Sequence, residues 1–161
     1  MSIWGAFAGG FVGTLVLTTA LRAASELKLT RMDLPFLLGT ALTADRTRAK
    51  LIGYALHFLF GQLFALTYFA IFTAIDHSGW GLGAMFGALH GLFAGTALVN
   101  ILLPTVHPRM GSPLTGAGTS ALLEPPGFLM RNYGLQTPLV SLVAHIAYGA
   151  IVGGFTSLAG G

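Results

Sequence analysis

Cysteine is absent from this 161-residue chain, and charged residues make up only 8% of it. Without cysteine there can be no disulfide, no thiolate metal ligand and no cysteine nucleophile. A soluble domain carries about 25% charged residues, so the charge in this chain is too little to cover a surface that faces water. The patterns HExxH, ExxH, DxD and GxGxxG and a phosphate-cradling loop are also missing. No catalytic activity can therefore be named from a motif.

Long apolar runs dominate the sequence that is present, of which 54% is hydrophobic. Four of them cover about residues 3–24, 51–75, 79–103 and 137–159. Each is long enough to cross a hydrocarbon core of ~30 Å at ~1.5 Å per residue. The first run starts almost at Met1 with no basic region before it, which is typical of a retained helix. We predict an all-α, integral membrane four-helix bundle that forms a single transmembrane domain over 1–161.

The basic residues predict an orientation in the membrane. All eight flank or occupy the two long loops between the runs: Arg22, Lys28, Arg31, Arg46, Arg48, Lys50, Arg109 and Arg131. The positive-inside rule then makes these loops cytoplasmic and both termini external. Read as topology markers, these residues indicate the lipid bilayer as the partner and no nucleic acid. In the first loop, "DLPFLLGTAL" predicts a short re-entrant or interfacial helix with Asp33 as its N-cap.

An offset of 78 residues aligns parts of the two halves of the chain. It brings Gly5, Gly9 and Gly13 onto Gly83, Gly87 and Gly91, and an offset of 88 brings His57 onto His145. We predict two tandem helix–loop–helix repeats, about 1–78 and 79–161, related by an axis along the membrane normal. The glycines at a spacing of four (the GxxxG pattern) predict close helix packing. The alternative is a groove that admits a flat cofactor, a lipid tail or a quinone.

Three histidines fall inside the apolar runs. His57 lies ~9 Å and His145 ~12 Å from the cytoplasmic ends of their helices, and His90 is nearer the middle. Ionisable side chains at such depth mark functional sites by default; the alternative is a neutral imidazole that bridges two helices. His57 and His145 share one site if the second and fourth helices meet. They form two separate sites if the glycine stripes pack the first helix against the third.

The loops offer further candidate ligands. Asp33 and Glu124 each precede a proline-stiffened segment, and His107 lies at the cytoplasmic mouth of the third run. We predict cofactor binding by His57, His145 and His90, and a metal site drawn from these three with His107, Asp33 and Glu124. Histidine–carboxylate sets suit Fe, Zn, Cu or Mn, and haem b is the other cofactor expected. The alternative for the carboxylates is helix capping or pairing with Arg31, Arg109 or Arg131.

The segments "RMDLPFLLGT", "VHPRMG" and "PPGFLMRNYG", set among four glycine-rich runs, carry a resemblance. Over nearly the whole chain the sequence resembles a family of small four-span bacterial integral membrane proteins of unassigned function. The resemblance implies a four-span fold and directs attention to the six polar positions already named. It implies no activity.

The leading functional hypothesis is a metal-binding or haem-binding protein, with redox chemistry as one option, whose histidine–carboxylate cluster lies in the cytoplasmic half of the membrane. The resemblance implies that this membrane is a bacterial inner (cytoplasmic) membrane. One alternative is an accessory structural subunit of a larger membrane complex, or a homo-oligomer, that docks through its glycine grooves. Another is a minimal transporter or proton pathway in which the histidines relay protons.

Overall fold

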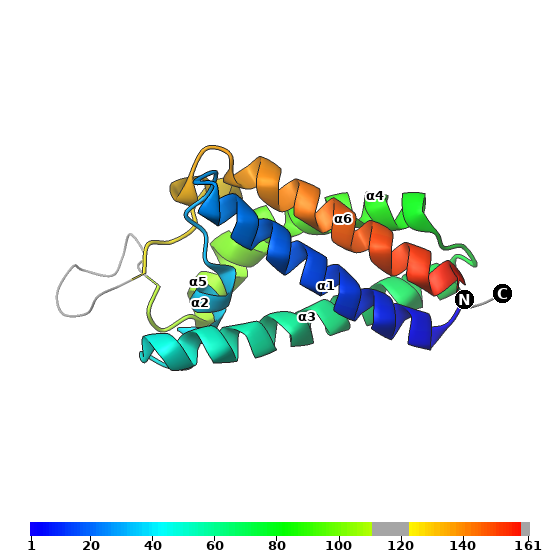
Figure 1. The fold of residues 1–161 in the computed structure, drawn as a ribbon, viewed down its shortest axis with the longest axis horizontal. Helices are drawn as coiled ribbons and strands as arrows, with labels where there is room; N and C mark the ends of the chain where they lie inside the picture. Colours follow the sequence, from blue (N-terminus) through cyan, green and yellow to red (C-terminus); the bar gives the residue numbers. More distant parts are fainter. Residues whose placement is uncertain (111–122, 159–161) are drawn as a thin grey trace.

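Four long apolar helices form the body of the protein, and the described residues contain no strand (Figure 1). The computed structural model describes residues 1–110 and 123–158. The helices long and apolar enough to cross a membrane are α1 (Ile3–Glu26), α3 (Arg46–Ala74), the continuous helix Trp80–Val106 and α6 (Thr137–Leu158). The protein is therefore an all-helical, multi-pass membrane protein, as the apolar runs predict.

The helix α6 lies between α1 and α4 (Trp80–Phe93) and packs along both of them. A Cβ atom added at Gly83 or Gly87 would collide with the main chain of α6, at the carbonyls of Gly149 and His145. On the other side, Gly13 of α1 lies directly against Tyr148. Both predicted glycine stripes therefore pack helices closely, and both pack against the fourth helix. In lipid, where no hydrophobic force drives helices together, such backbone approach stabilises the bundle through dispersion contacts.

Among the long helices, α3 packs mainly against α1, and the short segment Leu34–Gly39 also lies on it. Gly61 of α3 lies against the hydroxyl of Thr14, and the Tyr148 hydroxyl of α6 donates a hydrogen bond to the Gly61 carbonyl. Aromatic side chains fill the space between α3 and α4: Phe72 meets Phe86 edge to face, with 5.5 Å between ring centroids. Farther along, towards the end of the bundle that carries the long loops, α3 diverges from α6 (Figure 1). This divergence leaves room for a cavity.

The predicted short helix in the first loop is present as α2 (Leu34–Gly39). The Asp33 side chain accepts a hydrogen bond of 3.0 Å from the main-chain N–H of Phe36, and proline occupies the first turn. Both features favour a helix start, because they satisfy or remove N–H groups that lack intrahelical acceptors. The helix rests on α3, where Gly53 admits the carbonyl of Pro35.

The second and third helices extend beyond the predicted apolar spans. The second begins at Arg46, five residues before the predicted span, because the Asp45 carboxylate caps it by accepting a 2.7 Å hydrogen bond from the Arg48 N–H. The third extends past residue 103. It continues beyond α4 as a π-helix, η1 (Ala94–Leu102), and a final turn, α5 (Leu103–Val106).

The π-helix has a local cause in the sequence. Pro104 has no N–H and cannot complete the helical ladder behind it. The side-chain amide of Asn100 donates hydrogen bonds of 2.9 Å to the carbonyls of Gly95 and Thr96, which satisfies main-chain acceptors in the widened turn. π-Helical segments occur frequently at functional sites, and this one borders the cavity.

The two ends of the bundle differ in charge. The start of α1, the end of α6 and the turn between α3 and α4 lie at one end of the bundle, while α2, α5 and the 3₁₀ helix η2 (Phe128–Tyr133) lie at the other (Figure 1). All eight basic residues belong to the second end, hereafter the polar end.

Candidate functional site

Three histidines from three helices meet inside the bundle. His57 comes from α3, His90 from α4 and His145 from α6, and all three line one cavity; they are called the histidine cluster below. The rings of His90 and His145 cross at 73° with 4.8 Å between their centroids. They come this close because Gly91, one residue beyond His90, lies against the Cβ atom of His145. The fold thus brings the three predicted histidines of the apolar runs together.

The ring of His145 has a defined orientation. It is 8% exposed, and its Nδ1 atom lies 2.7 Å from the carbonyl oxygen of Ser141, one turn earlier in α6. A carbonyl oxygen can only accept, so Nδ1 carries the hydrogen. The lone pair therefore resides on Nε2, which is the atom available to a ligand or metal ion.

The other two histidines have buried nitrogens without a partner. Among the described residues, no group forms a hydrogen bond with Nε2 of His57 or Nδ1 of His90. The ring of His90 is also covered by Phe64, with centroids 3.8 Å apart. Leaving such a polar atom buried and unsatisfied costs about 1–3 kcal/mol. Buried polar atoms of this kind need an explanation, and a bound molecule or ion is one.

The histidine cluster borders a large apolar cavity. Its volume is about 520 Å³, within the usual range for small-molecule sites. Its wall consists mainly of apolar side chains from α1, α3, α4, η1 and α5. Met130 of η2 also lines it. Several residues that line the cavity are also exposed on the molecular surface. They are Phe60 of α3 and, on the Trp80–Val106 helix, Phe93, Leu102 and Val106. The cavity therefore opens sideways between α3 and the Trp80–Val106 helix, on a surface that would face lipid.

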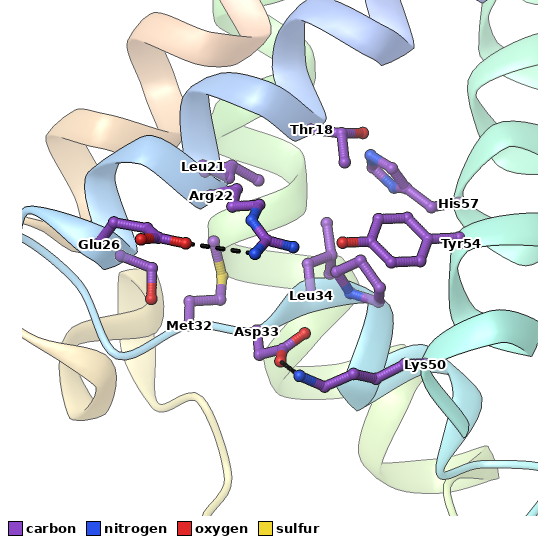
Figure 2. A pocket seen from close by; sticks show the side chains of 12 residues that line it. Thr18, Leu21, Arg22, Glu26, Met32, Asp33, Leu34, Lys50, Tyr54 and His57 are labelled. Carbon is purple, nitrogen blue, oxygen red and sulfur yellow. Dashed lines mark ion pairs between the residues drawn. The ribbon is translucent and has the colours of Figure 1, made fainter. Parts of the chain in front are cut away.

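A second, polar pocket of about 200 Å³ lies between α1, α2 and α3 (Figure 2). Two ion pairs occupy it: Arg22 with Glu26 at 3.3 Å, and Lys50 with Asp33 at 3.3 Å. The guanidinium of Arg22 lies between the carboxylate of Glu26 and the hydroxyl of Tyr54 (Figure 2). All four charged side chains remain more than two-fifths exposed, so the pocket belongs to the polar end of the bundle.

The polar pocket and the apolar cavity adjoin each other. Leu21, Met32, Leu34 and His57 line both of them. His57 therefore stands at the boundary, with charged groups on one side and apolar side chains on the other.

The remaining predicted ligands lie elsewhere. Asp33 caps α2 and pairs with Lys50, and Glu124 pairs with Arg31 at 3.4 Å. The two carboxylates thus have the capping and ion-pairing roles that were the alternative to metal binding. Nε2 of His107 lies 3.0 Å from the Leu37 carbonyl, where the buried ring ties α5 to α2. Asp33 reaches the polar pocket beside His57, but Glu124 and His107 do not join the histidine cluster.

The described residues contain no group of three or more histidine, aspartate or glutamate side chains placed to hold a metal ion. The metal site drawn from the six predicted residues thus stays a prediction. Its carboxylates form ion pairs at the polar end, and Asp33 also caps α2.

Sequence reasoning missed two parts of the site. One is the apolar cavity, which forms because α3 diverges from α6. No local sequence pattern predicts how two distant helices diverge. The other is the π-helix η1 along its edge. A signal for η1 existed in Asn100 placed four residues before Pro104.

Searches against protein-family models, curated proteins and solved structures found no match to this chain. The resemblance of its loop segments to a four-span family thus stays a prediction, and any function has to be argued from the site itself.

Proposed function

We propose that this membrane protein binds an apolar or amphiphilic molecule in the cavity, with the histidine cluster as the polar anchor. The observation that carries the proposal is the pair of buried nitrogens on His57 and His90, which have no partner among the described residues and belong to residues that line an apolar space of about 520 Å³. A ligand with one hydrogen-bonding group would satisfy such an atom and recover about 1–3 kcal/mol. The rest of the ligand would match the apolar wall.

The way into the cavity supports a ligand that arrives from the bilayer. The exposed lining residues belong to the lipid-facing sides of α3 and the Trp80–Val106 helix. With the basic end facing the cytoplasm of a bacterium, the opening would lie in the inner leaflet. A molecule dissolved in that leaflet would reach the histidine cluster without crossing water.

Packing in the other half of the bundle favours a binding site over an open channel. Between the histidine cluster and the chain termini, Phe72 and Val152 are fully buried, and Tyr68 is 4% exposed. Together with Phe86 they form a tightly packed layer, in which the Tyr68 hydroxyl is buried without a partner among the described residues. This layer would stop a ligand that entered the cavity from the polar end.

A metal ion is the second candidate ligand of the same cluster. The hydrogen bond from His145 Nδ1 to a main-chain carbonyl is the usual support for a metal-binding imidazole, and it leaves Nε2 free to coordinate. Haem held between His90 and His145 fits less well, whereas haem between His57 and His145 stays a prediction. Metal–nitrogen bonds of about 2.0–2.1 Å on opposite faces require ring centroids roughly 6 Å apart. His90 and His145 are 4.8 Å apart and nearly perpendicular.

Photolabelling tests the proposal directly. A long-chain alcohol that carries a diazirine is added to the purified protein in lipid nanodiscs, and labelled peptides are mapped by mass spectrometry. We expect labelling at the cavity wall, lost in Leu98→Trp, which fills the cavity, and retained in Leu92→Trp, which adds the same bulk to an exposed position of the same continuous helix. Equal labelling in both variants would refute a cavity site.

Elemental analysis tests the second candidate. Protein purified without chelators is assayed for Fe, Zn, Cu and Mn, and its absorption spectrum is recorded. Stoichiometric metal that is lost in His145→Gln supports the metal site. Absence of metal from protein that binds the photolabel contradicts it and leaves the membrane-ligand proposal standing.

A further inference from the structure

We infer that the molecule bound in the cavity is a lipid with a zwitterionic, phosphate-bearing head group, and that this head group lies in the polar pocket. The inference rests on the proposed function, because it assigns the head group of the ligand whose apolar part fills the cavity. It adds a class of ligand and a second binding region, lined by Arg22, Glu26, Lys50 and Asp33.

The adjacency of the two spaces is the first argument. The polar pocket and the cavity share four lining residues, with His57 among them. The proposed lipid would place its head among the charged residues and its chain in the apolar space, with these shared side chains between the two regions. Neither space alone matches a membrane lipid, because one is too polar for a chain and the other too apolar for a charged head.

The arrangement of charges is the second argument. The polar pocket holds two cations and two anions, so its formal charge is zero, and each cation has a carboxylate 3.3 Å away. A purely anionic head group that bound Arg22 and Lys50 would leave two carboxylates unpaired beside its phosphate. A zwitterionic head group brings a cation for them, so every charge keeps an opposite partner.

The existing ion pairs can exchange partners readily. Their side chains are 43–69% exposed, and exposed ion pairs contribute little to folding stability. The Tyr54 hydroxyl beside Arg22 adds a neutral donor, and tyrosine is enriched at the level of lipid head groups. The pocket thus has donors for a phosphate and acceptors for an ammonium at the depth where a lipid presents both.

The test compares two lipids with identical chains. Purified protein in detergent is titrated with dioleoyl phosphatidylethanolamine and with dioleoyl phosphatidylglycerol, and bound lipid is counted by native mass spectrometry. We expect the zwitterionic lipid to bind about tenfold more tightly, which is the effect of about one charge-assisted hydrogen bond. The variant Glu26→Gln should lose this preference. Arg22→Gln should weaken both lipids, and Arg48→Gln, outside the pocket, should change neither.

The outcomes separate this inference from the proposed function. A wild-type preference for the anionic lipid, or a preference unchanged in Glu26→Gln, overturns the zwitterionic head-group assignment. If Leu98→Trp abolishes the binding of both lipids, the cavity proposal stands even when the head-group assignment is wrong. If neither lipid binds and the diazirine alcohol also fails to label the cavity, both proposals are wrong.

Discussion

The close contact between α4 and α6 makes a strong prediction for Gly87. An alanine Cβ at this position would meet the His145 carbonyl group and lie 2.8 Å from the Cα atom of Ile146. Carbon atoms prefer a separation of about 3.5–4.0 Å, so the two helices would have to part by roughly 0.7 Å or more. A gap of that size forfeits a quarter to a half of the dispersion energy along the seam. We expect Gly87→Ala to lower the free energy of unfolding by about 1–3 kcal/mol.

Gly81 provides the matched control, because it lies on the same helix and a Cβ there would meet nothing within 4 Å. Replacing glycine by alanine in a helix is itself favourable by up to about 1 kcal/mol, and less near a helix end. Gly81→Ala should therefore be neutral or slightly stabilising. The difference between the two variants measures the clash.

Unfolding in mixed micelles of a mild detergent and sodium dodecyl sulfate, followed by far-ultraviolet circular dichroism, measures both variants. If Gly87→Ala unfolds at the same detergent fraction as Gly81→Ala, the α4–α6 seam is not a backbone contact. The histidine cluster would then lose its structural basis as well, since that seam holds His90 beside His145.

Three further predictions use the same unfolding assay. Tyr148→Phe removes the hydrogen bond to the Gly61 carbonyl and should lower the free energy of unfolding by about 0.5–1.5 kcal/mol. An unchanged free energy of unfolding would contradict a stabilising role of that bond. His107→Leu should cost about 1–3 kcal/mol, because the Leu37 carbonyl keeps only the Thr40 hydroxyl as a side-chain partner and the Arg109 main-chain N–H loses its acceptor. A neutral effect would argue against the link between α5 and α2. Burial and the nearby Glu124 raise the pKa of Tyr133 to about 12 from the usual 10, so the folded state holds that proton more tightly. Stability should consequently fall as the pH rises from 10 to 12, and the fall should be smaller in Tyr133→Phe; an identical fall would refute this assignment.

Local features of the sequence predicted local features of the fold. Apolar length gave the four long helices, since a run of twenty or more apolar residues has few other stable forms. Asp33 and Pro35 predicted the start of α2, because capping depends on residues within one turn. The helix α3 begins five residues before the second predicted apolar span. Its first turns carry Arg46, Arg48 and Lys50. A prediction based on hydropathy assigns such charged residues to a loop even when they begin a helix.

The meeting of the histidines depended on information that a single helix does not carry. The glycine stripes predicted that α1 and α4 pack closely, but a stripe does not identify its partner, and the structure assigns both stripes to α6. Once α4 lies against α6 at Gly87 and Gly91, His90 has to lie beside His145, because it shares the same helical turn. The glycines and the histidine of "GLGAMFGALHGLFAG" therefore belong to one arrangement. Close packing by the glycines sets the distance between the two rings, and the divergence of α3 leaves the space that those rings border.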